Sequence, residues 1–220
     1  MSSDSVDPVS CGDRSVEFFD RQFQRQIREG ETALNPFEEI ALPYLRGRVL
    51  DFGCGMGNLA IAAARRGCIV TALDASATAI AHLRQRAELE SLAIDAQQAD
   101  LRGHRMTEEF DAIVSIGLLM FFDCATAFRC LSNLQAQVRG GGVAVVNTLI
   151  EGTTYLDMFS PDGHCLFPRT ELEQRFAGWD IVHSGQRDFA VAPDKVKLFA
   201  TVIAQKPVAT LNPASRGTNI

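Results

Sequence analysis

Hydrophobic residues recur at helical spacing in the first part of the chain. Segment 13–29 carries one apolar stripe while its arginines fall elsewhere, which predicts an amphipathic helix. A second helix is predicted to begin at Pro36, because Asn35 can cap its first turn and proline fits the first helical position. The polar residues 1–12 are expected to be disordered. The stripe of the first helix consists of Val16, Phe19, Phe23 and Ile27.

From residue 48 onward, short apolar runs alternate with amphipathic segments. Glycines at 67 and at 140–142 are expected to end the first and the last of the intervening helices. Alternation of strand and helix predicts a parallel sheet with helices on both faces. The predicted strands are 48–51, 69–74, 95–99, 110–115 and 142–149, and the predicted helices are 58–66, 76–90 and 125–138.

The rhythm changes after residue 168. A short helix is predicted at 169–176, followed by two consecutive strands at 180–190 and 196–206. The intervening "VAPDK" has the composition of a turn, so these two strands must pair antiparallel. The expected fold is therefore α/β, with a doubly wound, mostly parallel seven-stranded sheet that ends in a C-terminal antiparallel hairpin. Residues 207–220 are expected to be a flexible tail.

Charge and composition narrow the class of partner. The 220 residues carry a net charge of −6 and no basic run longer than Arg65–Arg66, which argues against nucleic-acid and membrane-surface proteins. No stretch approaches the roughly 18 apolar residues of a membrane helix, and the polar, acidic N-terminus is unlike a signal peptide. The interpretation is that the protein acts on a small molecule. Its oligomeric state is left open.

The cysteines do not suggest a metal or redox site. They stand at 11, 54, 68, 124, 130 and 165, without a C-x-x-C pair. That spacing is typical neither of a zinc site nor of a disulfide framework. Most of these cysteines are expected to be reduced core residues, which favours a cytoplasmic setting. No metal site is predicted.

One stretch, "VLDFGCGMGN" at 49–58, carries the candidate chemistry. A segment with this many glycines disfavours both helix and strand. It lies directly after a predicted strand and directly before a predicted helix. In this fold class such a turn binds a small molecule at the carboxyl ends of the strands. A nicotinamide fingerprint, G-x-G-x-x-G, would need a third glycine at 58, where the chain has Asn58. The pattern here is instead G-x-G-x-G, two residues after Asp51.

This pattern resembles the first motif of the class I S-adenosylmethionine-dependent methyltransferases, acidic-x-G-x-G-x-G. Further matches follow in order: "TALD" ending at Asp74, "QQAD" ending at Asp100, "FDAIVS", "VRGGGVAVV" and the terminal hairpin. The resemblance covers about residues 35–206 and implies a Rossmann-like fold with S-adenosylmethionine as cofactor. We therefore expect an N-terminal tail and lid-like helix at 1–34, the class I methyltransferase domain at 35–206, and the tail.

The resemblance also implies roles for individual residues. Asp51 would hold the amino group of the cofactor, Asp74 its ribose hydroxyls, and Asp100 its adenine, flanked by Leu101 and Met120. Backbone at Gly53 and Gly55 would pack against the methionine part, where a Cβ would block it. The helix beginning at Asn58 would point its N–H dipole end at the carboxylate. The full expected set is Asp51, Gly53, Cys54, Gly55, Asn58, Asp74, Ala75, Asp100, Leu101, Ser115, Ile116 and Met120.

Each acid also has a simpler explanation. Asp51 and Asp100 can be ordinary turn residues, and Asp74 can be an acid that stabilises the N-terminus of the next helix.

A closer resemblance is to the tellurite-resistance methyltransferases, in "SIGLLMFFD", "FAGWDI" and "VKLFATVIAQK". It implies acceptors that are soft nucleophiles: oxyanions of tellurium or selenium, and small thiols. In that family an arginine precedes "FAT", whereas this chain has Leu198 at that position. The family's histidine–arginine pair is also missing from "GQRDFAVAPDK", which has only Arg187. An oxyanion site needs cations, so these departures favour a thiol or an uncharged acceptor.

Two segments are expected to form the acceptor wall. The first helix could fold over the cofactor as a lid, with Phe19 and Phe23 either facing the acceptor or simply packed in the core. The long insertion "EGTTYLDMFSPDGHCLF" offers Tyr155, Met158 and Phe159, with Tyr155 and His164 as weak candidates for a catalytic base. A soft nucleophile would need little help from a base, because the main task is alignment and exclusion of water.

Two other functions remain possible from the sequence. One is a non-catalytic S-adenosylmethionine-binding sensor or partner protein, since intact binding motifs do not establish turnover. The other is a nicotinamide-dependent enzyme, against which Asn58 and the terminal hairpin count. The identity of the methyl acceptor is not determined by the sequence.

Overall fold

The computed structural model describes residues 14–105, 107–159 and 163–208. The segments predicted to be disordered, 1–12, and most of the predicted tail lie outside the described residues. The helices are α1 (Arg14–Glu29), α2 (Pro36–Ala41), α3 (Asn58–Arg65), α4 (Ala77–Leu89), α5 (Cys124–Gln137) and α6 (Glu171–Gln174), with 3-10 turns η1 (Leu42–Tyr44) and η2 (Leu119–Phe121). The strands are β1 (Arg48–Phe52), β2 (Ile69–Asp74), β3 (Ile94–Gln98), β4 (Phe110–Ile116), β5 (Val138–Leu149), β6 (Asp180–Ala192) and β7 (Lys195–Gln205).

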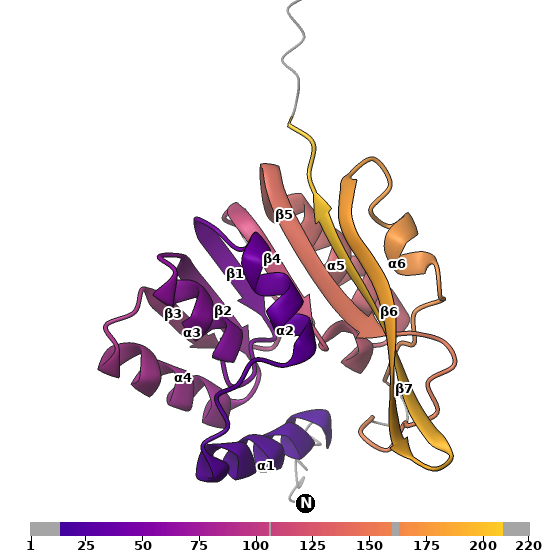
Figure 1. Cartoon of the computed structure of the whole chain (residues 1–220), viewed down its shortest axis with the longest axis horizontal. Coiled ribbons are helices and arrows are strands. Elements are labelled where there is room, and N and C mark those ends of the chain that lie inside the picture. The colour runs from indigo at the N-terminus through magenta and orange to yellow at the C-terminus, as the bar shows by residue number, and fades with distance from the viewer. Residues whose placement is uncertain (1–13, 106, 160–162, 209–220) are drawn as a thin grey trace, which may run out of the picture.

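The strands form one seven-stranded sheet in the order β3-β2-β1-β4-β5-β7-β6. Strands β1 to β5 pair parallel, and β7 pairs antiparallel with both β5 and β6. The predicted fold, a doubly wound sheet with a C-terminal hairpin, is thereby confirmed (Figure 1). The order turns back between β1 and β4, and a crevice at such a switch point is where ligands bind in open α/β sheets.

Alternating residues of the central strands enter two separate cores. Val49 packs with the helices α3 and α4, whereas its neighbour Leu50 packs with α5 and α6. The same alternation recurs in β4, where Ala112 and Val114 face one core and Ile113 the other. Both faces of the sheet are therefore covered, as the hydrophobic pattern predicts for parallel strands.

Local sequence explains where several helices begin. Asn35 and Glu38 form a reciprocal capping box at α2, with Pro36 in the first turn. Ser76 caps α4 through Ala79 N, and Asp123 caps α5 through Thr126 N. The prediction that Gly140–Gly142 closes the preceding helix is wrong. That helix ends at Gln137, and β5 begins at Val138, so the glycines lie inside the strand.

Gly142 shows why a glycine stands in that strand. A Cβ there would lie 2.8 Å from the carbonyl oxygen of Asp111 in the neighbouring strand β4. Close approach of two backbones, rather than a helix end, accounts for this glycine. The hairpin turn is also shorter than "VAPDK", because β6 runs to Ala192 and β7 starts at Lys195.

The cysteines differ from expectation in one respect. Cys54, Cys68 and Cys130 are buried and free, as predicted for core residues. Cys124 and Cys165, however, form a disulfide across 41 positions of sequence. This bond ties the start of α5 to the segment that follows β5, and it removes the cysteine argument for a reducing compartment. A cytoplasmic setting stays a prediction. Within the described residues, no helix combines the length and apolarity needed to cross a bilayer.

Candidate functional site

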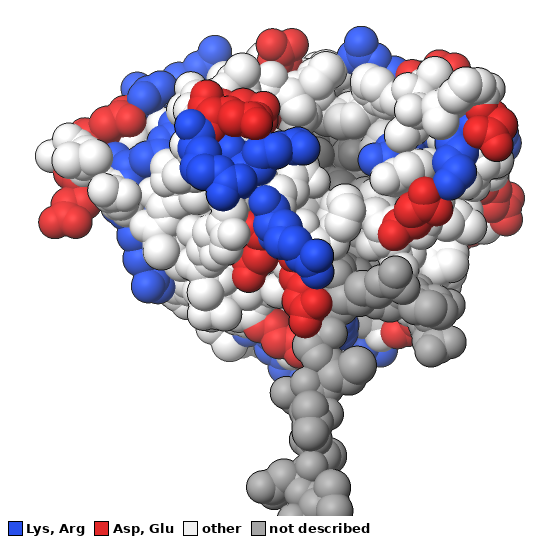
Figure 2. Space-filling view, turned by 90° about the horizontal axis from the view of Figure 1, so that it is seen from below, with Lys and Arg blue, Asp and Glu red and all other residues white. Residues whose placement is uncertain are grey.

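A cavity of about 980 Å³ lies at the carboxyl edge of the sheet. Its walls come from the glycine turn after β1, the ends of β2, β4 and β5, the hairpin β6–β7, and α1 and α2. In Figure 1, α1 lies apart from the sheet beneath this edge. The volume is at the upper end of the roughly 300–1,000 Å³ typical of small-molecule pockets. The molecular face seen from below in Figure 2 carries a group of adjoining basic side chains near its centre, with acidic side chains on either side of it.

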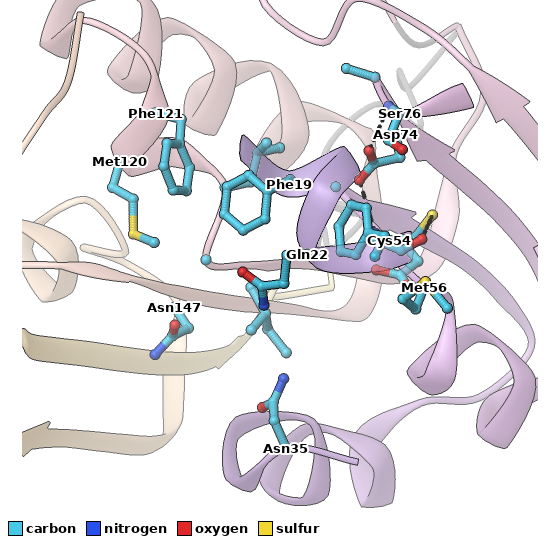
Figure 3. A pocket seen from close by; sticks show the side chains of 18 of the residues that line it. Phe19, Gln22, Asn35, Cys54, Met56, Asp74, Ser76, Met120, Phe121 and Asn147 are labelled. Atoms are coloured by element: carbon cyan, nitrogen blue, oxygen red, sulfur yellow. Dashed lines mark hydrogen bonds between the residues drawn. The ribbon is translucent and has the colours of Figure 1, made fainter. Parts of the chain in front are cut away.

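Helix α1 reaches into this cavity with its apolar stripe. Phe19 stacks on Phe23 with ring centroids 5.7 Å apart, and it meets Phe121 edge-on at 5.0 Å. In Figure 3, Phe19 and Gln22 lie between Phe121 on one side and Cys54 on the other. The Ser76 hydroxyl donates a hydrogen bond to Asp20, which links α1 to the start of α4. Phe19 and Phe23 both line the cavity.

The glycine turn is held against β2. Gly53 N and Cys54 N both donate to Leu73 O, at 2.8 and 3.0 Å. Gly53, Gly55 and Gly57 all have positive φ, of 85°, 50° and 69°. Such angles are strained for any residue with a Cβ.

The space around these glycines corrects one expectation. A Cβ at Gly53 would stand 2.8 Å from Leu118, and a Cβ at Gly57 would stand 2.5 Å from Leu83. Those two glycines make room for protein side chains as well as for the turn. Only Gly55 looks across the cavity, where a Cβ would meet the ring of Phe23 at 3.3 Å.

Asp74 is fixed at the end of β2 by backbone N–H groups. Its Oδ2 accepts from Gly55 N and its Oδ1 from Ser76 N, each at 2.9 Å. Burial raises the pKa of this carboxyl, although the same backbone hydrogen bonds oppose the rise. Asp74 therefore joins the glycine turn to the first turn of α4.

Asp51 is the most unusual group in the cavity. Its side chain is only 5% exposed, and its Oδ2 has no hydrogen-bond partner in the part of the protein described. Burial, followed by the charges of Glu38 and Asp74, raises the pKa of Asp51 to about 8. A buried acid with an unpaired oxygen is costly unless a donor or cation meets it. This wall of the cavity is suited to a positively charged ligand group.

Most of the predicted cofactor residues line this one cavity, and one does not. Ser115 is fully buried and absent from the wall, whereas the adjacent Ile116 lines it. Neighbouring strand residues point to opposite faces of a sheet, so only one of the two can face the cavity. Asp100 lies on the wall with its Oδ1 accepting from Arg102 N at 3.1 Å. The residues that line the cavity are Asp51, Gly53, Cys54, Gly55, Asn58, Asp74, Ala75, Asp100, Leu101, Ile116 and Met120.

The predicted acceptor residues divide in the same way. Met158 lines the cavity, but Tyr155, Phe159 and His164 do not. Phe159 packs behind Phe121 at 5.1 Å, and the His164 ring stacks on Phe159 at 4.8 Å. The candidate bases His164 and Tyr155 are thus not among the residues that line the cavity, and the Tyr155 ring lies beside Lys195 and Lys197 of the hairpin.

Several cavity residues had no clear signal in the sequence. Lys197 and Phe199 on β7 and Phe189 on β6 reach the cavity from the hairpin, and Phe37 reaches it from α2. Asn147 interrupts the apolar run of β5, and a buried amide in such a run could have been noticed. Its Nδ2 donates to Thr201 Oγ1 at 2.9 Å. Among the described residues, no cluster of His, Cys, Asp or Glu is arranged to hold a metal ion.

Comparison with known proteins agrees with this geometry. Residues 49–142 match the family model described as a methyltransferase domain. The ubiquinone biosynthesis O-methyltransferase of Rhodopseudomonas palustris (strain HaA2) is 30% identical over 189 residues, covering 77% of this chain and 74% of that protein. The probable S-adenosyl-L-methionine-dependent methyltransferase TehB of Haemophilus influenzae (strain 10810) is 26% identical over 166 residues, 72% of this chain.

The structural comparison supports the same fold. The crystal structure of TehB from Haemophilus influenzae aligns with a TM-score of 0.70 at 22% identity, covering 82% of this chain and 65% of that one. The match covers 57% of the TehB relative's length, so this chain spans little more than half of it. The domain match, the 30% relative and the fold together show that the chain belongs to the class I S-adenosylmethionine-dependent methyltransferases, with a likeness to the tellurite-resistance branch.

Proposed function

We propose that this protein transfers the methyl group of S-adenosylmethionine to a small molecule bound in the same cavity. The observation that carries the proposal is Asp51: a buried carboxyl with an unpaired oxygen, beside the glycine turn and close to two further acids. S-adenosylmethionine carries an ammonium and a sulfonium, which this acidic wall would stabilise. The neighbouring carboxylates and the cavity volume fit the rest of the molecule.

Individual residues have distinct tasks in this proposal. Asp51 holds the ammonium, and the N–H groups at the start of α3 face the carboxylate. Asp74, already fixed by Gly55 and Ser76, accepts from the ribose hydroxyls. Leu101 and Met120 contact the adenine, and Asp100 accepts from its amino group. When bound, the cofactor supplies an activated methyl group.

Helix α1 is proposed to act as a lid. Phe19 and Phe23 line the cavity from α1, so a displacement of α1 would open this side of it to a ligand. In the closed position these rings exclude water from the acidic wall and hold the acceptor beside the glycine turn. Exclusion of water and alignment of the two reactants are the main contributions that such a site makes to methyl transfer.

The side chains of the cavity wall limit the chemical class of the methyl acceptor. No histidine occurs among the described residues that line the cavity. An acceptor that needs deprotonation by a strong base is therefore a poorer fit than a soft or already ionised nucleophile, such as a thiol or a chalcogen oxyanion. A screen for S-adenosylhomocysteine formation with thiols, selenite, tellurite and hydroxyl compounds tests this. Turnover of hydroxyl compounds alone would contradict it.

Cofactor binding is the first measurement. Calorimetric titration with S-adenosylmethionine and S-adenosylhomocysteine should give micromolar binding, and NAD should not bind. Binding of NAD alone would replace the proposal with the nicotinamide-dependent alternative. Binding without turnover of any acceptor would favour a sensor or partner protein.

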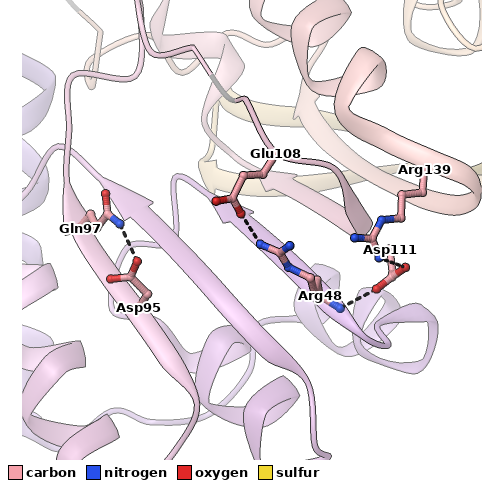
Figure 4. Close-up of polar contacts among 6 residues, drawn as sticks. All are labelled: Arg48, Asp95, Gln97, Glu108, Asp111 and Arg139. Carbon is pink, nitrogen blue, oxygen red and sulfur yellow. Dashed lines mark hydrogen bonds and ion pairs between the residues drawn. The ribbon is translucent and has the colours of Figure 1, made fainter.

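Asp74→Ala gives a residue-level test. Loss of a buried, charged hydrogen-bond acceptor should weaken S-adenosylmethionine binding by about 2 kcal/mol or more. The control is Asp95→Ala on β3, an exposed carboxylate that pairs with Gln97 at 2.6 Å and lies outside the cavity (Figure 4). Equal affinities for the two variants would contradict the role of Asp74.

A further inference from the structure

Lys197 places an ammonium group in the cavity wall. It lies on β7 opposite Phe189 of β6, and it lines the cavity together with Phe199, two residues further along the strand. Leu198, between them, points the other way: it packs against the core beneath α5 and α6, and its Cδ1 would stand 2.8 Å from a Cβ on Gly152. Residue 198 therefore faces away from the cavity, whereas residue 197 faces it.

The ammonium of Lys197 has no anionic partner. Among the described residues it makes no ion pair, and its Nζ lies 4.7 Å from the centre of the Tyr155 ring. Burial lowers the pKa of Lys197. A half-buried cation without a counter-ion is stabilised when a ligand supplies one.

Lys195 shows the contrast within the same strand. Its Nζ lies 5.6 Å from the same Tyr155 ring, but it forms an ion pair with Asp157 at 2.7 Å and does not line the cavity. The two lysines thus share one aromatic neighbour and differ in pairing and position.

The surroundings of Lys197 are aromatic. Phe37, Phe189 and Phe199 pack against one another, with ring centroids 4.9 to 5.8 Å apart. All three line the cavity, and Met158 and Phe121 continue the apolar surface. The acids of the cavity lie instead on β1, at the end of β2, just after β3, and on α2. The cavity therefore has an acidic part at the glycine turn and an apolar part, with one free ammonium, at the hairpin.

We propose that the methyl acceptor is an apolar, ring-sized molecule with one anionic group, which Lys197 binds while Phe37, Phe189 and Phe199 contact the apolar body. The inference rests on the proposed function and specifies the class of its acceptor. A small inorganic oxyanion would satisfy Lys197 but leave the aromatic wall without a partner. A neutral apolar molecule would fill the wall and leave the ammonium unpaired.

The test compares two probes of equal shape, 2-naphthoate and 2-naphthamide, by calorimetry on protein saturated with S-adenosylhomocysteine. The charged probe should bind about tenfold or more tightly than the neutral one, since a desolvated charge-assisted hydrogen bond adds to the same ring contacts. Lys197→Met should abolish this preference, and Lys197→Arg should retain most of it. Lys195→Met is the matched control and should leave the preference unchanged. Phe189→Ala should weaken both probes by a similar factor.

Three results would overturn the inference. One is absence of naphthoate binding to the wild type, or binding that Lys197→Met leaves unchanged. A second is selenite binding more tightly than naphthoate through Lys197, which would indicate a small-oxyanion site. A third is a tenfold loss of S-adenosylhomocysteine affinity in Lys197→Met, which would assign the lysine to the cofactor carboxylate.

The same titrations separate the inference from the proposed function. Failure of the wild type to bind S-adenosylhomocysteine would defeat the proposed function, and titration of the free protein with the two probes would still decide the role of Lys197. Normal S-adenosylhomocysteine affinity in Lys197→Met shows that the variant is folded, so a lost preference for naphthoate is then a property of the acceptor site.

Discussion

The ring of Phe23 lies so close to Gly55 that a Cβ on this glycine would stand 3.3 Å from the ring. Helix α1 and the glycine turn are thus in direct contact across the cavity. Phe23→Ala should remove this contact and weaken the closed position of α1. We expect the affinity for S-adenosylhomocysteine to fall by up to about tenfold, in line with the roughly 0.5–1.5 kcal/mol contributed by an aromatic pair such as Phe19–Phe23.

The control for Phe23→Ala is Arg21→Ala. Arg21 belongs to the same helix, but its side chain is 80% exposed and pairs with Glu17 at 3.7 Å. A calorimetric titration in which both variants bind with wild-type affinity would mean that α1 does not act as a lid.

From the raised pKa of Asp51 we expect cofactor binding to release a proton. With a pKa raised to about 8 by burial and neighbouring acids, Asp51 is largely protonated in the free protein at pH 7. An ammonium group placed beside it would lower that pKa and release the proton. The binding enthalpy of S-adenosylmethionine should therefore differ between phosphate and Tris buffers. For each proton released, the difference equals the difference between the ionisation enthalpies of the two buffers. Asp51→Asn should abolish most of this difference.

The same group makes the stability of the free protein depend on pH. The pKa of Asp51 is higher in the folded protein than the roughly 3.9 of an unfolded chain, so Asp51 lowers the free energy of unfolding as pH rises from about 4 to 8. Asp51→Asn should become more stable than the wild type across this range, and the gain should level off above pH 8. Denaturant unfolding of both proteins at pH 5, 7 and 9 measures it, and a pH-independent difference would contradict the assignment.

Asp111 should show the opposite dependence on pH at the other end of the sheet. Its carboxylate accepts from Arg48 N at 2.7 Å and from Arg139 at 3.0 Å (Figure 4). The Arg48 backbone hydrogen bond, followed by Arg139, lowers the pKa of Asp111. Its contribution to stability is therefore present above about pH 4 and lost as the pH falls through the lower, folded-state pKa.

Asp111→Asn should destabilise the protein by roughly 1 kcal/mol at pH 7, a modest value because the pair is partly exposed to solvent. The difference from the wild type should shrink below about pH 4. Cofactor affinity should be unchanged, since Asp111 is not part of the cavity wall. A loss of affinity would show that the amino and carboxyl ends of the sheet are coupled.

The disulfide Cys124–Cys165 should stabilise the fold by about 2–4 kcal/mol, because it closes a loop of 41 positions. Reduction with dithiothreitol should lower the melting temperature of the wild type. The double variant Cys124→Ser/Cys165→Ser should melt at that lower temperature with and without the reductant. A wild-type melting temperature that stays unchanged although thiol titration shows Cys124 and Cys165 to be reduced would contradict the expected contribution.

Sequence by itself determined the features that depend on near neighbours. Asn35 was identified as a cap because a capping side chain bonds to backbone only two or three residues away. The order of strands and helices follows from hydrophobic spacing, and the glycine turn at 53–57 follows from its own composition. Asp51 and Asp74 were found because they stand at fixed distances from that turn.

Tertiary structure alone decided which side chains meet in the cavity. Ser115 and Ile116 are adjacent residues at the end of β4. Which of the two faces the cavity depends on how β4 is placed in the sheet, and the structure shows that it is Ile116. Lys197 faces the cavity and Leu198 does not, for the same reason: adjacent residues of a strand point to opposite faces of the sheet.

Contacts between distant segments were equally beyond the sequence. Cys124 and Cys165 are brought together by the packing of α5 against the segment after β5, and Phe37 meets Phe199 because α2 lies beside the hairpin. Such pairs depend on how whole elements dock, and neither local propensity nor spacing along the chain carries that information.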